Sequence, residues 1–295
     1  MEPLTFSIYL TLLIKMIVYR TKKDLVSHLD ALRSHGKSVG FVPTMGALHE
    51  GHTSLIQRAK KENDLLVVSI FVNPTQFSDP TDLENYPRKM DDDLKLLQSL
   101  EVDVAFTPSV KEMYPEDDHT SFDLGHLDKV MEGKYREGHF KGVTQIVSKL
   151  FETIRPDRAY FGQKDFQQLV IIRKLVGLMG LDTAIVSCPI VREPDGLAMS
   201  SRNELLTREE RKAAPFIYIT LKIAREKKAV LSPAELKSWV EEQFENQPLM
   251  KLDYFEIVDD QQLRPIEQWS EDVNKVGCIA VRLGKVRLID NVNFN

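Results

Sequence analysis

Hydrophobic positions along the chain follow two different periods. Between residues 21 and 35, Leu25, Leu29 and Leu32 recur at helical spacing among charged residues. This spacing predicts an amphipathic helix that is opened by a threonine cap and closed before Gly36. Residues 65–71 instead form a near-continuous apolar run, which is typical of a parallel strand covered on both faces. Further short apolar runs predict strands at 38–42, 102–106, 159–161 and 184–190.

Helical segments separate these strands, at residues 53–62, 91–99, 143–154 and 166–178. The alternation predicts an α/β fold with a doubly wound, Rossmann-like parallel sheet. Ligands bind beyond the carboxyl ends of the strands in such a sheet. The polar residues that follow each strand are therefore the candidates for function.

The pattern changes after about residue 190. Two helices are predicted first, and three strands follow, of which the last two turn at Gly284; the segments are 208–226, 233–244, 252–258, 278–283 and 285–290. Helices followed by antiparallel strands predict a smaller α+β domain. We interpret residues 16–189 as a Rossmann-like ligand-binding domain and residues 190–295 as a C-terminal lid domain, with a hinge around 188–195.

The first fifteen residues need a separate interpretation. The mostly apolar stretch 4–14 is too short to span a bilayer. It also lacks the basic start and small-residue cleavage site of a secretory signal. Met16 begins a more natural domain start, so residues 1–15 are interpreted as an N-terminal extension.

Composition and charge narrow the classes of partner. The chain has 295 residues, 42% of them apolar and 28% charged, which is an ordinary soluble balance. A net charge of −5 provides no general basic field for nucleic acid, so any phosphate site must be local. Cys188 and Cys278 lie far apart without metal-ligand spacing, as expected in a reducing cytoplasm. We expect a cytoplasmic protein that binds neither nucleic acid nor membrane.

One strand-to-helix turn carries the strongest chemical signal. Two histidines, His49 and His52, lie where the strand at 38–42 leads through a glycine-bearing turn into a helix. Free backbone N–H groups and the helix dipole favour an anion there, phosphate above all. Both rings lie on one side, and protonated imidazoles would add charge-assisted hydrogen bonds. A helical zinc pair needs histidines four apart, whereas these are three apart; two histidines merely satisfied in a loop remain an alternative.

With its flanks, this turn resembles a known family. Residues 43–52, Pro-Thr-Met-Gly-Ala-Leu-His-Glu-Gly-His, resemble the signature of pantothenate synthetases, a branch of the nucleotidylyltransferases with a His-x-Gly-His phosphate site. Later segments are similar to family elements in the same order: Val-Asn-Pro-Thr-Gln-Phe at 72–77, Gly-His-Phe-Lys-Gly-Val at 138–143, Phe-Gly-Gln-Lys-Asp-Phe-Gln-Gln at 161–168 and Met-Ser-Ser-Arg-Asn at 199–203.

The resemblance implies an ATP site. Its residues would be Pro43, Thr44, Met45, Gly46, His49, His52, Gly162, Gln163, Lys164, Asp165, Val191, Met199, Ser200, Ser201 and Arg202. The catalytic groups among them would be His49, His52, Lys164, Ser200, Ser201 and Arg202, which stabilise charge on the phosphates. The segment at 199–203 would close on the β- and γ-phosphates. Gln163 stands where glutamate is common, so its contact with the nucleotide stays open.

The resemblance also implies a pantoate site, formed by Met45, Asn73, Gln76, Val143, Val147 and Gln168. Gln76 would grip pantoate, and the valines would form an apolar wall against its gem-dimethyl group. From the residues alone, Asn73 and Gln76 could equally serve turn chemistry around Pro74.

Three further expectations follow from the resemblance. Mg²⁺ would accompany ATP, and Asp92 or Asp93 could lie near it. Three consecutive acids at 91–93 are nevertheless more typical of a solvated helix start, so no metal ligand is assigned. The polar loop at 77–90 is long enough to act as a gate. Family members are usually homodimers through the larger domain, so a homodimer is expected.

The implied activity is an ATP-dependent condensation of pantoate with β-alanine through a pantoyl adenylate, giving pantothenate, AMP and pyrophosphate. Two other classes stay open. A different nucleotidylyltransferase would share the His-x-Gly-His site, and a non-catalytic module would bind ATP without turning it over.

Overall fold

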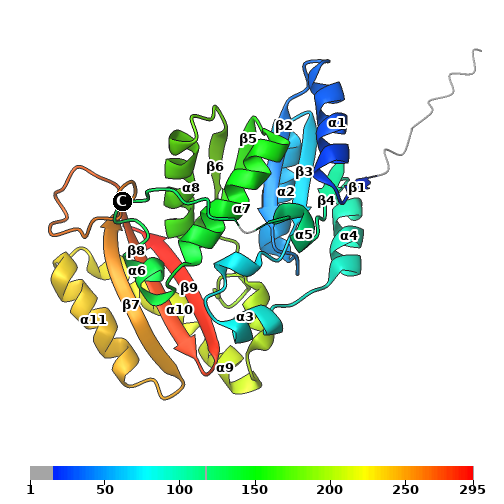
Figure 1. Ribbon diagram of the computed structural model, residues 1–295. Coiled ribbons are helices and arrows are strands. Elements are labelled where there is room, and N and C mark those ends of the chain that lie inside the picture. The colour runs from blue at the N-terminus through cyan, green and yellow to red at the C-terminus, as the bar shows by residue number, and fades with distance from the viewer. Residues whose placement is uncertain (1–15, 117, 295) are drawn as a thin grey trace, which may run out of the picture.

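The computed structural model describes residues 16–116 and 118–294, so the predicted extension at 1–15 lies outside the described residues. Its larger part is a six-stranded parallel sheet with strand order β1-β4-β3-β2-β5-β6 (Figure 1). The strands are β1 (Ile17–Tyr19), β2 (Val39–Thr44), β3 (Leu65–Ile70), β4 (Val104–Phe106), β5 (Arg158–Gly162) and β6 (Ala184–Cys188). The predicted parallel sheet is confirmed, although the short edge strand β1 was not expected.

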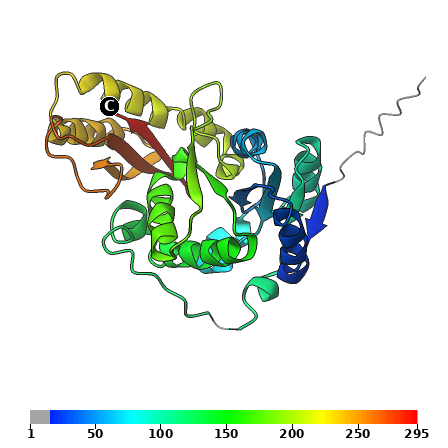
Figure 2. The same ribbon diagram turned by 90° about the horizontal axis from the view of Figure 1, so that it is seen from above.

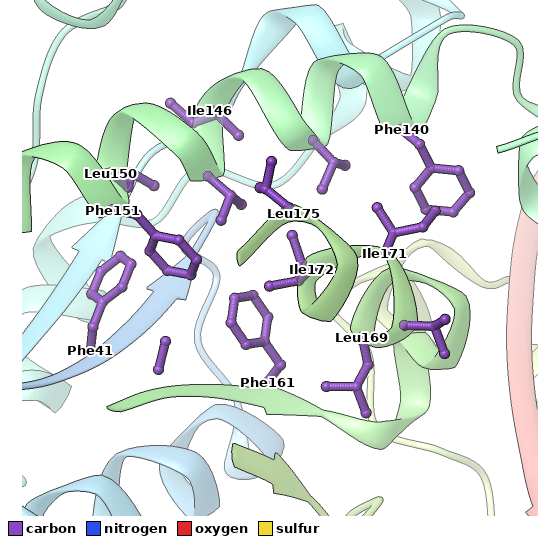
Figure 3. Packing of buried hydrophobic residues seen from close by; sticks show 14 of the residues in the cluster. Phe41, Phe140, Ile146, Leu150, Phe151, Phe161, Leu169, Ile171, Ile172 and Leu175 are labelled. Atoms are coloured by element: carbon purple, nitrogen blue, oxygen red, sulfur yellow. The ribbon is translucent and has the colours of Figure 1, made fainter. Parts of the chain in front are cut away.

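Helices cover both faces of this sheet. They are α1 (Lys22–Arg33), α2 (Glu50–Glu62), α3 (Pro80–Asn85), α4 (Met90–Ser99), α5 (Val110–Met113), α6 (Met131–Tyr135), α7 (His139–Ile154) and α8 (Phe166–Leu178). Neighbouring residues of a strand point to opposite faces. Phe41 of β2 therefore lies in one buried cluster with residues of α1, α7 and α8, and Figure 3 shows it beside Phe151 of α7. Val42 lies in a second cluster with residues of α2 and α4. Burial of each such side chain contributes roughly 1.5–3 kcal/mol to stability.

The C-terminal part has its own core and an antiparallel sheet of β7 (Met250–Asp259), β8 (Lys275–Leu283) and β9 (Val286–Asn293). Three helices pack with it, α9 (Arg208–Ala213), α10 (Phe216–Lys227) and α11 (Pro233–Glu245). Figure 2 shows this part, yellow to red, to one side of the parallel sheet. The predicted turn at Gly284, with φ of +54°, is confirmed. The division after residue 189 and a lid movement stay predictions.

Several helix boundaries differ from the sequence expectations. The single helix predicted at 208–226 is two helices, because Pro215 lacks the N–H that would continue the ladder. Helix α2 begins at Glu50, three residues early, because His49 caps it. Helix α7 begins at His139, after Gly138 in a left-handed conformation. Helix α3 lies within the predicted loop at 77–90, and α5 and α6 were not expected.

Among the residues that the structure describes, every helix is too short or too polar to cross a membrane.

Candidate active site

A cavity of about 220 Å³ lies where the strands of the parallel sheet end at their carboxyl side and where residues 189–202 lead into the C-terminal part. Two predicted residues, Gly46 and Gln163, do not line it. The others all do: Pro43, Thr44, Met45, His49, His52, Asn73, Gln76, Val143, Val147, Gly162, Lys164, Asp165, Gln168, Val191, Met199, Ser200, Ser201 and Arg202. Segments far apart in sequence are thus brought to one place.

The two histidines are fixed by the backbone of the helix they open. Nδ1 of His49 accepts a hydrogen bond from the Gly51 N–H at 3.1 Å, and Nδ1 of His52 accepts one from the His49 N–H at 3.3 Å. Because Nδ1 is the acceptor in each neutral ring, the proton is on Nε2. Both residues line the cavity, so each offers it an Nε2–H donor.

Both rings are neutral at physiological pH. Burial, reinforced by the nearby Lys164 charge, lowers the pKa of His49 to about 4. Burial, reinforced by His49, lowers the pKa of His52 to about 3. These lowered pKa values favour neutral rings, without the charge assistance that an imidazolium would add. The phosphate-directed groups of this turn are neutral donors, because a charged imidazole would have to give up both its solvation and the Nδ1 acceptor role.

The turn before the helix is held by Asp93 of α4. Its carboxylate accepts hydrogen bonds from the N–H of Ala47 at 2.9 Å and of Leu48 at 2.8 Å. Gly46 and Ala47 have φ of +82° and +49°, and a Cβ at Gly46 would lie 2.8 Å from Asp93 Oδ2. Asp93 is only 3% exposed, so the expectation that all three acids at 91–93 are solvated is wrong for this one. Both its oxygens serve the turn.

The amide wall consists of Asn73, Gln76 and Gln168. Asn73 Nδ2 donates to Gln76 Oε1 at 3.1 Å and to the Gly142 carbonyl at 3.0 Å, while the Tyr114 hydroxyl donates to Asn73 Oδ1 at 2.8 Å. Asn73 is thus used within the protein and orients Gln76. Gln76 Nε2 lies 3.0 Å from Met45 Sδ, and Gln168 makes no side-chain hydrogen bond to any described residue. Gln76 is thus hydrogen-bonded within the protein through both atoms of its amide, whereas the Gln168 amide is left for a ligand.

Lys164 supplies a fixed positive charge. Its side chain is 19% exposed, and its ammonium lies 3.9 Å from the Asp165 carboxylate. The loop that carries it is held from β9, where Asn291 Nδ2 donates to the carbonyls of Gln163 at 2.8 Å and Lys164 at 3.1 Å. Asn291 was not predicted as a site residue, because its segment carries no motif.

The segment at 199–205 closes the cavity against the predicted gate. Ser201 Oγ donates to the Tyr86 hydroxyl at 3.4 Å, and Arg202 pairs with Asp82 of α3 at 3.0 Å. Tyr86 is 6% exposed and lines the cavity, and burial raises its pKa. Sequence reasoning had placed Tyr86 only in a mobile loop. Its aromatic character beside Pro87 and Arg88 was the available signal.

The arrangement combines two chemistries in one cavity. Neutral donors from His49 and His52, the Lys164 and Arg202 charges and two serine hydroxyls suit phosphate groups. Val143 and Val147 form an apolar wall beside the amides of Gln76 and Gln168, which suits a small branched ligand with polar ends. Among the described residues, no cluster of three or more His, Cys, Asp or Glu could hold a metal ion. Within that part of the chain, carboxylates alone do not build a metal site.

Known proteins similar to this chain match it over nearly its whole length. Residues 17–293 match the family described as Pantoate-beta-alanine ligase. The chain is 53% identical over 279 residues to the pantothenate synthetase of Bacteroides thetaiotaomicron, covering 95% of this chain and 99% of the relative. The corresponding protein of Porphyromonas gingivalis is 50% identical over the same shares.

Solved structures give the same result. A pantothenate synthetase from Thermus thermophilus superposes with a TM-score of 0.88 at 42% identity, covering 95% of this chain and 99% of that one. The pantoate-beta-alanine ligase of Francisella tularensis, complexed with Beta-gamma ATP and β-alanine, superposes with a TM-score of 0.79 at 38% identity, covering 95% and 98%.

Proposed function

This chain belongs to the pantoate-beta-alanine ligase family, and we propose that the cavity described above is where it joins pantoate to β-alanine. The protein is an ATP-dependent ligase that forms the amide bond of pantothenate. The observation that supports this location is the pairing, in one cavity, of a phosphate-directed side with an apolar wall that carries the amides of Gln76 and Gln168.

In the first step, a carboxylate oxygen of pantoate attacks the α-phosphorus of ATP, and the bond to the β-phosphate oxygen breaks. The products are pantoyl adenylate and pyrophosphate. The Nε2–H groups of His49 and His52 and the Lys164 ammonium stabilise negative charge on the α-phosphate, while Arg202 and the serines at 200 and 201 hold the departing pyrophosphate. This chemistry is mainly positioning and charge stabilisation, so no covalent nucleophile is needed.

In the second step, the free amine of β-alanine attacks the carbonyl carbon of the adenylate. The new C–N bond forms, the bond between that carbon and the phosphate oxygen breaks, and AMP leaves while the amine loses a proton. Gln76 and Gln168 keep the pantoyl group in place through both steps, and Val143 and Val147 exclude water from it.

A divalent cation, Mg²⁺, would accompany ATP. Since the described carboxylates form no metal-binding cluster and Asp93 is used by its turn, the ion would be held chiefly by phosphate oxygens and water. The ion would neutralise negative charge on the phosphates, and the side chains of Arg202 and Lys164 would also neutralise part of that charge.

The proposal predicts exchange of labelled pyrophosphate into ATP with pantoate alone, followed by AMP release once β-alanine is added. Lys164→Ala and His52→Ala should lose about 10²-fold or more of this exchange. Circular dichroism and melting temperature should change little for Lys164→Ala, because the ion pair of that ammonium with Asp165, at 3.9 Å, is longer than a hydrogen bond. Exchange that requires β-alanine, or ADP in place of AMP, would contradict the mechanism.

The amides of Gln76 and Gln168 should affect the use of pantoate and ATP unequally. Replacing Gln76 or Gln168 by alanine should raise the KM for pantoate far more than that for ATP, because each amide lies in the pantoate wall. Steady-state kinetics with each substrate varied in turn measures the difference. Equal losses for both substrates would assign the pair a structural role.

A homodimer is proposed from the family resemblance. Strand β6 ends the sheet, and the backbone groups along an edge strand are available for contact. Light scattering should give about twice the chain mass of 33.8 kDa; a monomer at working concentration would reject the assembly.

A further inference from the structure

A second, smaller cavity of about 30 Å³ lies directly against the central one, because Lys164, Asp165 and Gln168 line both. Its remaining walls come from α6, the start of α7 and the C-terminal sheet, and they include Arg136 and His139. A volume of this size holds about two water molecules. It therefore fits a small polar group at the end of a ligand whose other end lies in the central cavity.

Arg136 and Lys164 are the cations that line this chamber, and Arg136 belongs to it alone. Its side chain is 20% exposed, and its NH1 group donates to His139 Nε2 at 3.2 Å. His139 Nδ1 in turn donates to the Gln76 carbonyl at 2.9 Å, which leaves Nε2 as the acceptor. Burial and the Arg136 charge lower the pKa of His139 to about 4. Arg136 is therefore held by a neutral imidazole, which does not offset its charge.

Three carboxylates line the chamber, those of Glu132, Asp165 and Asp290. Asp290 pairs with Arg192 at 2.6 Å, and Asp165 lies 3.9 Å from Lys164. Glu132 and Asp82 each lie 3.9 Å from the Arg136 guanidinium, beyond hydrogen-bond distance. Glu132 instead pairs closely with Arg287 and accepts from the Tyr254 hydroxyl at 2.9 Å. Asp82 pairs with Arg202 at 3.0 Å.

The local charge balance follows from these pairs. Six cationic side chains, of Arg136, Lys164, Arg192, Arg202, Arg282 and Arg287, face five carboxylates, of Asp82, Glu132, Asp165, Asp253 and Asp290. Within this described group, Arg136 is the arginine without a carboxylate at hydrogen-bond distance. Burial and the nearby Arg202 lower its pKa, yet arginine stays protonated in proteins. A half-buried positive charge without a close anion favours binding of an anionic ligand.

We propose that Arg136, oriented by His139, binds the carboxylate of β-alanine in this chamber. The inference rests on the proposed function, which supplies the second substrate. A guanidinium suits a carboxylate because it can donate two parallel hydrogen bonds. With the carboxylate there, the amine extends past Gln168 and Lys164 into the cavity where the adenylate forms. Arg136 thereby selects an amine that carries a carboxylate.

The test separates the two half-reactions. Arg136→Gln should raise the KM for β-alanine roughly 10- to 150-fold, the range expected for a lost charged hydrogen bond. Pyrophosphate exchange with pantoate alone should stay within about twofold of the wild-type rate. The wild-type preference for β-alanine over 3-aminopropanamide, which lacks the negative charge, should fall by a similar factor. Arg136→Lys should restore part of it, and Arg173→Gln, an exposed arginine of α8, serves as the matched control.

Each outcome supports or overturns one proposal. An unchanged KM for β-alanine in Arg136→Gln, or equal use of β-alanine and 3-aminopropanamide by the wild-type protein, would overturn the carboxylate site. Equal losses of exchange in Arg136→Gln and Asp82→Asn would overturn it, because Arg136 would then serve to hold α3 in place through Asp82. Absence of exchange in the wild-type protein would reject the proposed function itself. If Arg136→Gln does not fold, the Arg136→Lys protein and the wild-type amine preference decide.

Discussion

At the scale of single residues, His49 and His52 use their two ring nitrogens differently. Nδ1 of each accepts a backbone N–H of the helix start, and Nε2 donates toward the cavity. A proton on Nδ1 would break the cap, so structure and function both require the neutral ring. Asn73 likewise serves the protein itself, because its side-chain amide donates to Gln76 and so orients it.

The neutral histidines predict a pH dependence of stability. Their folded pKa values, about 4 for His49 and about 3 for His52, lie below the ordinary 6.5. The unfolded chain therefore binds more protons below pH 6.5, and the free energy of unfolding should decrease as pH falls from 6.5 toward 4. Each imidazole contributes up to about 1.4 kcal/mol per pH unit. Urea unfolding at several pH values measures the slope.

The matched variants for this slope are His52→Asn and His35→Gln. His52→Asn retains an acceptor near the Nδ1 position but cannot be protonated, so its slope should be shallower than that of the wild type. His35→Gln, at the exposed end of α1, should keep the wild-type slope. Identical slopes in all three proteins would show that His52 is not held neutral by the fold.

At the scale of elements, the phosphate-directed turn depends on a helix that carries no ligand contact. Helix α4 presents Asp93 to the backbone N–H groups of Ala47 and Leu48, between β2 and α2. The left-handed Gly46 brings the chain close enough for this contact. The position of His49 is thus set by a carboxylate more than forty residues later in the sequence.

Asp93→Asn should therefore weaken both fold and activity. An asparagine amide offers one acceptor oxygen and turns an N–H group toward a backbone N–H, so at least one buried donor is left unpaired. The expected loss is roughly 1–3 kcal/mol of unfolding free energy, together with slower pyrophosphate exchange. Asp92→Asn is the control, because Asp92 is 75% exposed and its ion pair is with Lys95. Equal stability of the two variants in denaturant titrations would contradict this role.

At the scale of the whole molecule, the C-terminal part does more than cover the cavity. Asn291 of β9 holds the loop that carries Lys164, and Asp290 pairs with Arg192 through two contacts of 2.6 and 2.9 Å. Arg287 of the same strand reaches Glu132 of α6. The small antiparallel sheet thus holds the loop of Lys164, a proposed catalytic residue that follows strand β5 of the parallel sheet.

Asn291→Ala should reveal this positioning. The side chain does not line the central cavity, yet its loss frees the carbonyls that fix the Lys164 loop. Pyrophosphate exchange should slow about 10- to 100-fold, with less change in the KM for ATP, since small misplacements of a catalytic group are costly. Asn246→Ala, at the exposed end of α11, should leave exchange unchanged. A normal rate of pyrophosphate exchange in Asn291→Ala would show that the Lys164 loop keeps its position without Asn291.

Local patterns predicted most of the fold and the motif residues. The apolar runs placed β2 to β6, because buried parallel strands need continuous hydrophobic residues. The motifs at 43–52, 161–168 and 199–203 placed Lys164, Ser200 and Arg202 at one site, because strand ends in a doubly wound sheet meet at one edge. The predicted helix starts were less accurate than the predicted strands, because His49 is an uncommon cap and Pro215 breaks a periodic segment.

What only the tertiary structure decided are interactions between residues distant in sequence. Asp93 was expected in solvent, and Asn291 carried no motif, because an isolated carboxylate or amide gives no sign of the backbone it will meet. The neutral state of His52 likewise depends on burial by several elements at once. The sequence by itself determined which chemical groups the protein has and which strands carry them. Their charge states and partners were decided by the fold, because desolvation and hydrogen bonding depend on the complete environment.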